Sequence, residues 1–389
     1  MILHPGIIAL LIGTALVLAM VIHAAVIGGL ILRRWDFTSS SAGQLGLERK
    51  TYLVSTLLNY ALAFQILSTF LFIYTLDDVH PLFSGAMCAT GSLNANPVGW
   101  YALLVKIAVF FLAGLWIVLN MIDQMVEDYP LIKLKYTLLI GLLPFIVLDF
   151  FFQFSYFTGL DPEIITSCCG SLFGGGGGNV ASSLATLPVG KTMVVFYTLA
   201  LFFIAMMLLC LFSKKPLFRS ILSITAAAFL IMAIIAVLSF VSIYIYELPT
   251  HHCPFDMVQQ EYGFIGYPLY LSLFCGVFFG VLPGIFQPAK RIQNVVAPLD
   301  RIEKKWLLSS LGFTLFFILL VSWQVIFSNL KSFSVSVSPG LVSCQVCNDL
   351  RPGRSGASPR GAAPALIAFK CQFICDVRPG CSWLSGKYS

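Results

Sequence analysis

Charged residues are scarce in this chain. They make up 10% of its 389 residues, whereas hydrophobic residues make up 58%, and a soluble domain usually carries about 25% charged residues. The mean hydropathy is +0.91. The apolar residues form long unbroken runs instead of amphipathic periods, which excludes a large soluble protein with an ordinary core. The composition therefore predicts an integral membrane protein.

Eight apolar runs are long enough to cross a bilayer, which takes roughly 20 residues in a helix. They span residues 6–32, 52–76, 101–122, 137–157, 193–212, 221–246, 267–286 and 307–327. The first run has no basic segment before it and is too long for a signal peptide, so it is interpreted as a first transmembrane helix. The expected fold is an all-α polytopic bundle of about eight transmembrane helices in residues 1–330.

Lys and Arg concentrate in alternate loops between these runs. The basic set is Arg33, Arg34, Arg49, Lys50, Lys133, Lys135, Lys214, Lys215, Arg219, Lys290, Arg291, Arg301, Lys304 and Lys305, whereas the opposite loops carry little beyond Lys191. The positive-inside rule places the basic set in the cytoplasm, so both termini should be extracytoplasmic. The net charge of +6 is thus interpreted as topology in a bacterial inner membrane. The bilayer is an expected partner and nucleic acid is not.

The predicted outer loops collect most of the cysteine and histidine. They hold His4, His80, Cys88, Cys168, Cys169, His251, His252 and Cys253. Cys210 and Cys275 lie inside apolar runs, where cysteine usually serves as a packing residue.

Three interpretations of this outer set stay open, and the first is structural. An oxidising compartment permits disulfides between the loops. Cys88, Cys168, Cys169 and Cys253 would allow two bridges in three possible connectivities. The protein would then be a membrane anchor with tied outer loops.

The second interpretation is a metal site. Thiolate and imidazole together suit zinc, copper or another soft ion. The candidate ligands are His251, His252, Cys253, Cys168, Cys169 and Cys88. Cys168 and Cys169 stand in Thr-Ser-Cys-Cys-Gly-Ser, a six-residue stretch that resembles the vicinal-cysteine motif of mercuric-ion transport proteins. That resemblance implies handling of a soft metal ion.

The third interpretation is thiol redox chemistry, with Cys168, Cys169 and Cys253 as candidate reactive residues. Cys253 follows two histidines and precedes Pro254, and a protonated histidine lowers the pKa of a neighbouring thiol. A C-x-x-C motif would need a cysteine where Asp256 stands, so a redox partner must come from another loop, as Cys88 or Cys168. The protein would then serve as a membrane subunit of an electron-transfer assembly with other membrane or periplasmic redox proteins.

Two ionisable residues fall within predicted spans, where a charge is costly in lipid. Lys106 and Asp149 lie roughly 7 Å and 12 Å from the outer ends of their helices at ~1.5 Å per residue. These similar depths predict an ion pair, which either locks the helices or belongs to a transporter pathway. Asp123 is expected in a cytoplasmic loop, exposed to solvent.

His23 is the only histidine deep within a span. A b-type haem held by two intramembrane histidines would need a second one, so this cofactor is not expected. Residues 331–389 are rich in Gly, Pro, Ser and Arg and contain a Cys344-Gln-Val-Cys347 motif. Their composition predicts disorder or a translation that has left the natural reading frame.

Overall fold

The computed structural model of the chain describes residues 3–36, 41–126, 129–161, 163–164, 166, 183–184, 187–328 and 330. Within these ranges the secondary structure is helical and contains no strand, which confirms the all-α prediction. The tail 331–389, the five glycines 174–178 and the pair Cys168 and Cys169 lie outside the described residues.

Eight helical segments are long and apolar enough to cross a membrane, so the protein is an integral membrane protein. They are α1 (Pro5–Arg34), α2 (Ala42–Asp78), α4 (Gly99–Asp123), α5 (Ile132–Thr158), α8 (Val189–Phe212), α9 (Pro216–Ala236) with its continuation, α11 (Gly266–Ile285) and α12 (Gln293–Phe327). α9 continues through the π-helical segment η2 (Val237–Val241) into α10 (Ser242–Tyr246).

Two of these helices begin well before the apolar runs that predicted them. α2 begins at Ala42 and α12 at Gln293, where the runs begin at residues 52 and 307. The added turns are polar and basic, so hydropathy does not detect them. At the start of α2 the Ser41 hydroxyl accepts a hydrogen bond from the Gln44 amide, which is the usual way to cap a helix N-terminus.

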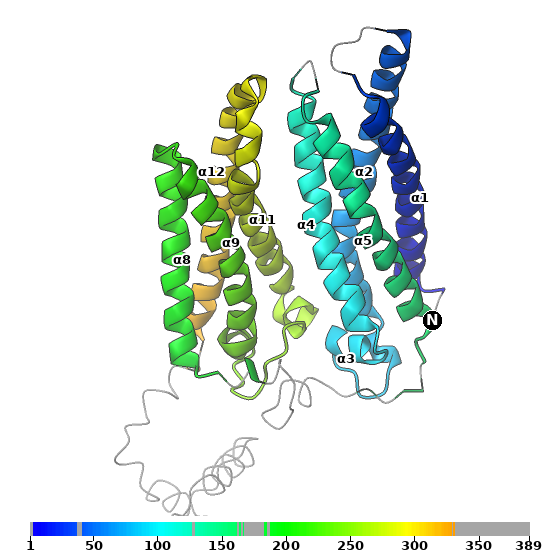
Figure 1. Ribbon diagram of the computed structural model, residues 1–389. Helices are drawn as coiled ribbons and strands as arrows, with labels where there is room; N and C mark the ends of the chain where they lie inside the picture. The colour runs from blue at the N-terminus through cyan, green and yellow to red at the C-terminus, as the bar shows by residue number, and fades with distance from the viewer. Residues whose placement is uncertain are drawn as a thin grey trace, which may run out of the picture. The chain divides into compact units, whose positions relative to one another are not determined.

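The helices pack in two groups of four (Figure 1). α1, α2, α4 and α5 pack against one another, and so do α8, α9, α11 and α12. Aromatic rings connect the groups. The ring centroids of Phe110 and Phe111 in α4 lie 5.5 and 5.8 Å from the ring centroid of Phe274 in α11. Each group therefore has its own helix contacts, and a shared aromatic core joins the two.

Short elements cover one end of the helices and are called the cap here. The first cap segment, residues 79–98, contains η1 (His80–Leu82) and α3 (Ala89–Asn94), and the second, residues 247–265, contains η3 (Asp256–Val258) and η4 (Gln260–Tyr262). Gln259 joins them, because its Nε2 donates to the Met87 carbonyl at 2.9 Å, and it also donates to Asp77 Oδ1 at the end of α2 at 3.1 Å.

The opposite end of the helices holds an ion pair where we had expected solvated charge. Asp123 is fully buried, and its Oδ2 lies 2.7 Å from Lys135 Nζ, which is also fully buried. α4 extends to Asp123 and α5 starts at Ile132, so both side chains lie within helix ends that pack together. The prediction of a solvent-exposed Asp123 was therefore wrong, and Lys135 is not a free loop charge.

Candidate functional site

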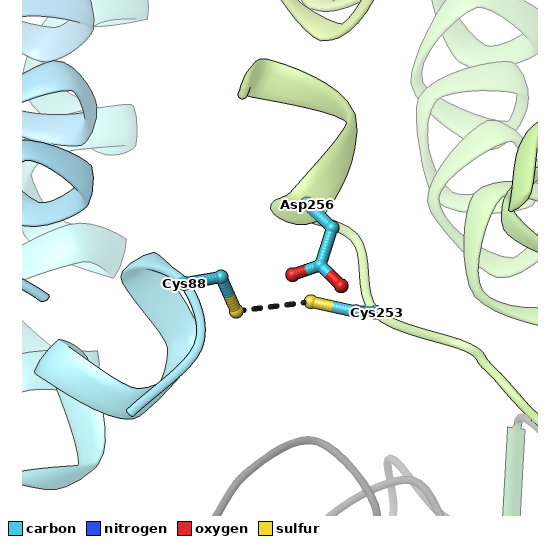
Figure 2. A group of neighbouring side chains, drawn as sticks. All are labelled: Cys88, Cys253 and Asp256. Carbon is cyan, nitrogen blue, oxygen red and sulfur yellow. Dashed lines mark hydrogen bonds between the residues drawn. The ribbon is translucent and has the colours of Figure 1, made fainter. Parts of the chain in front are cut away.

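Cys88 and Cys253 meet in the interior of the cap (Figure 2). Their Sγ atoms are 3.4 Å apart although 165 positions separate them in sequence. The side chains are 1% and 0% exposed. Cys88 comes from the first cap segment and Cys253 from the second, so the contact joins a loop of each four-helix group.

The second cap segment is fixed in place by Tyr246, the last residue of α10. Its hydroxyl donates to the Cys253 carbonyl at 2.6 Å and accepts from the Met257 amide at 2.9 Å. Glu247, the next residue, has φ = 53°, in the left-handed region. This conformation ends the helix and turns the chain back over it. The turn brings the Cys253 carbonyl to the Tyr246 hydroxyl and the Cys253 sulfur to Cys88 of the first segment.

Asp256 is the third member of the cluster. One of its carboxylate oxygens and the two sulfur atoms all lie within 4.8 Å of one another. Figure 2 shows the carboxylate pointing toward the two sulfurs from the turn of η3. The side chain is 6% exposed, its Oδ2 pairs with His251 Nε2, and its Oδ1 has no hydrogen-bond partner.

The electrostatics of the cluster follow from its burial and from the Asp256–His251 pair. Burial raises the pKa of Asp256 above its ordinary value, because it disfavours the charged form. The hydrogen bond to Asp256 raises the pKa of His251. The Cys253 sulfur accepts from the Phe255 amide at 3.4 Å and lies 3.3 Å from Thr90 Oγ1. These polar neighbours favour negative charge on Cys253, and the carboxylate gives a nearby proton acceptor.

The two adjacent histidines have different roles. His251 contacts Asp256 and packs edge-on against Tyr246 at 4.8 Å. His252 turns away, and its Nδ1 lies 2.8 Å from the Leu238 carbonyl within the π-helical segment. Of the predicted metal ligands in this loop, Cys253 therefore belongs to the cluster, and His251 reaches it through its pair with Asp256.

The other two histidines predicted on the outer side lie away from the cluster. His4 Nε2 is 3.1 Å from Asp78 Oδ2, and His80 contacts Asp77. Each has an acidic partner of its own and neither joins the cysteine cluster. Asp256 was not predicted as a site residue, although it stands where a C-x-x-C pattern would need its second cysteine. The spacing Cys253-Pro-Phe-Asp256 was the available signal.

Lys106 and Asp149 form the expected ion pair within the first four-helix group. Lys106 Nζ lies 3.1 and 3.2 Å from the two carboxylate oxygens, and both residues are 1% exposed. Gln65 of α2 donates to the same carboxylate. One helical turn nearer the cap, Gln153 donates to Thr14 Oγ1 at 3.3 Å. The pair is therefore part of a buried polar layer that connects α1, α2, α4 and α5.

His23 lies on the outer side of the first group. It borders an open apolar groove on α1 and α2, lined by Ala19, Met20, His23, Ala24, Val54, Leu57 and Leu58. Among the described residues, no other histidine lines this groove.

The chain matches no known family model, no curated protein and no solved structure. Its function must therefore be argued from the geometry of the cap.

Proposed function

We propose that this integral membrane protein performs thiol–disulfide redox chemistry, with Cys88 and Cys253 as the reacting pair. The observation that supports it is the 3.4 Å separation of the two Sγ atoms. A disulfide bond is about 2.05 Å long, so a movement of little more than 1 Å joins the sulfurs. Two thiols that are distant in sequence and isolated from solvent meet at one point.

The reaction is a two-electron exchange with a partner disulfide. The Cys253 thiolate attacks one partner sulfur, the other partner sulfur leaves as a thiolate and takes up a proton, and a mixed disulfide forms. Cys88 then loses its proton and attacks Cys253 Sγ, which releases the second partner thiol. The partner gains two electrons and two protons, and the cap keeps the disulfide. Run in reverse, the same steps oxidise a partner dithiol.

Cys253 is assigned the attacking role because two polar groups contact its sulfur. The Phe255 amide donates to it and Thr90 Oγ1 lies within hydrogen-bonding distance, and such donors stabilise a thiolate. Cys88 would serve as the resolving residue. Both sulfurs are buried, so exchange requires the two cap segments to separate and admit the partner.

The partner belongs on the side of the membrane that the cap faces. The loop charges predict that this is the outer side of a bacterial cytoplasmic membrane. We infer that the partner is an extracytoplasmic dithiol protein or a redox subunit of the same membrane assembly. A disulfide-forming compartment would supply the oxidant for such a partner.

Thiol labelling in defined redox buffers tests this proposal. The purified full chain is equilibrated in reduced and oxidised glutathione mixtures, alkylated, digested and analysed for the Cys88 and Cys253 peptides. The expected result is a single two-electron transition that Cys88→Ser and Cys253→Ser abolish. Cys275→Ser, which changes a cysteine within α11, is the matched control. A pair that never forms a disulfide would reject the proposal, and one that resists every reductant would instead mark a structural anchor.

A second candidate function rests on the polar layer around Lys106. Gln65 Oε1 and Gln153 Oε1 are both buried and have no hydrogen-bond partner. Buried polar groups usually find partners in protein or ordered water, so these two oxygens favour a hydrated space beside the ion pair. A transporter would use such a space as part of a proton or substrate path, and the double substitution described below separates this role from a structural one.

A further inference from the structure

Three potential ligand atoms converge in the cap, and they suit a metal ion as well as a disulfide. We propose that, when Cys88 and Cys253 are reduced, they bind one zinc ion together with Asp256. The three side chains come from the two cap segments, are all buried, and bring two sulfurs and one carboxylate oxygen within 4.8 Å of one another. This inference goes beyond the redox proposal and stands without it.

The spacing of the sulfurs is close to that of a zinc site. Zinc binds thiolate sulfur at about 2.3 Å in tetrahedral geometry, which places two sulfur ligands about 3.8 Å apart. The Cys88 and Cys253 Sγ atoms are 3.4 Å apart. Widening this gap by ~0.4 Å is a small adjustment of two side chains and needs no rearrangement of the cap.

The state of Asp256 is an independent indication of a ligand. Its side chain is more than nine-tenths buried, and Oδ1 has no hydrogen-bond partner. The buried carboxylate has the Cys88 and Cys253 thiols and His251 as its polar neighbours, and a buried charge with few strong partners is costly. A cation between Oδ1 and the sulfurs would remove that cost. Oδ2 is bonded to His251, in the way that metal-binding carboxylates are commonly held by a second group.

The ligand set selects among metals. Two thiolates exclude hard ions such as magnesium and calcium, which take oxygen ligands. The carboxylate disfavours copper(I), which prefers sulfur, whereas zinc accepts sulfur and oxygen together. Binding would release two thiol protons to solvent, because the thiolate is the ligand.

The coordination would be incomplete with protein ligands alone. His252 is engaged with the Leu238 carbonyl, and His4 and His80 have acidic partners elsewhere. The described residues thus supply three ligands, and a three-ligand zinc site keeps an open position for water or a substrate. A disulfide between Cys88 and Cys253 would remove both thiolates, so oxidation and zinc binding exclude each other.

The test measures zinc on the full chain in detergent, reduced with a phosphine. Seven other cysteines lie outside the described residues, at positions 168, 169, 344, 347, 371, 375 and 381, and are changed to serine in a parallel background. Zinc content after dialysis gives stoichiometry, and competition with a chromophoric chelator gives affinity. Cobalt(II) is added as a spectroscopic probe, since thiolate ligation gives a charge-transfer band.

One zinc per chain in the serine background is the expected result, with loss of binding in Cys88→Ser and Cys253→Ser. Asp256→Asn should lower the affinity at least tenfold, and His251→Gln about 10–100-fold, as loss of a supporting group does. Asp161→Asn and Cys275→Ser, both away from the cluster, should bind normally.

Two results would overturn the zinc site: no binding by the reduced background protein, or undiminished affinity in Asp256→Asn. A reversible disulfide without zinc binding removes this inference and leaves the redox proposal. Zinc binding by a cysteine pair that never forms a disulfide would support the zinc site and reject the redox proposal. A cobalt spectrum without the charge-transfer band would place the ion away from the two sulfurs and would also reject the site.

Discussion

Cys88 and Cys253 belong to cap segments of different four-helix groups, and their sulfurs lie 3.4 Å apart. Oxidation of this pair would give the two groups a covalent link at the cap. Their described contacts elsewhere are noncovalent, such as the Phe111–Phe274 ring contact at 5.8 Å. The oxidation state of one pair of atoms thus decides whether the two halves are covalently joined there.

This link can be detected by cutting the chain between α5 and α8. A protease recognition sequence placed at 174–178 separates residues of the first group from those of the second. After oxidation and cleavage, the two fragments should migrate together on a denaturing gel and separate when reductant is added. Cys88→Ser fragments should separate under both conditions. Fragments that stay joined in Cys88→Ser would show that other cysteines carry the link.

Lys106 and Asp149 should stabilise the first group as a unit. Removing one member of a buried pair typically costs about 3–5 kcal/mol, because the other charge loses its partner. Lys106→Met and Asp149→Asn should each lower the free energy of unfolding by about that amount, and the double variant should lose less than the two single losses combined. Denaturant unfolding in detergent measures this.

The same double variant separates a helix-locking role from a pathway. Unimpaired thiol exchange together with recovered stability would leave the pair with a structural role. A double variant that folds and keeps thiol exchange, yet loses a transport activity of the wild type, would instead favour the transporter.

Gln259 should control access to the buried sulfurs. Its amide connects the second cap segment to Asp77 at the end of α2 and to the Met87 carbonyl in the first segment, so Gln259→Ala removes both of these hydrogen bonds. We expect alkylation of reduced Cys88 to become about 5–30-fold faster, because the free energy that holds the cap closed would fall by about 1–2 kcal/mol. Gln260→Ala changes the exposed neighbour and should leave the rate unchanged. Equal rates in both variants would show that these bonds do not hold the cap closed.

Tyr246 should position the Cys253 loop through its hydroxyl. Tyr246→Phe leaves the Cys253 carbonyl and the Met257 amide without this partner, at a cost of about 1–3 kcal/mol. The midpoint of thermal unfolding should fall, and the Cys88–Cys253 disulfide should form less completely in a given redox buffer. Tyr60→Phe, at a 74% exposed position on α2, is the control. An unchanged redox equilibrium in Tyr246→Phe would separate this hydroxyl from the thiol pair.

Loop charge predicts which side of the membrane each helix end faces. In a variant with all native cysteines changed to serine, Leu248→Cys in the cap should react with an impermeant maleimide in intact cells. Ser213→Cys, between α8 and α9, should react only after permeabilisation. The reverse labelling pattern would place the cap in the cytoplasm and remove the oxidising compartment from the redox proposal.

The long helices could be predicted from sequence because a membrane span is a local property of about 20 consecutive residues. The pairing of Lys106 with Asp149 was also accessible, since depth along two helices can be counted from their ends. The early start of α12 was not, because its first turns are polar and resemble a loop in hydropathy. Asp123 was misplaced for a related reason, because a charged residue at a helix end is buried only if another helix end covers it.

The sequence limits the candidate cysteines to four in the predicted outer loops, but it does not show which two of them meet in the cap. Four loop cysteines allowed three connectivities, and loop composition does not state which loops meet. Asp256 gained its importance only from the turn after α10, which carries it back toward Cys88. His251 and His252 were equally plausible ligands from sequence, because both stand just before Cys253. In the structure His252 contacts the Leu238 carbonyl and does not contact the cluster.

The π-helical segment Val237–Val241 can be regarded as a one-residue insertion into an otherwise regular helix. An α-helix turns by about 100° per residue, and the wider π-helical turn takes up the rotation that the extra residue adds, so deleting Ser239 would leave the helix beyond it in nearly the same rotational phase. The Tyr246 hydroxyl would keep its place, whereas the Leu238 carbonyl, which lies 2.8 Å from His252 Nδ1, would return to the regular hydrogen-bond pattern of the helix. A single extra residue near the cap end of this helix thus frees a backbone carbonyl to contact the cap loop.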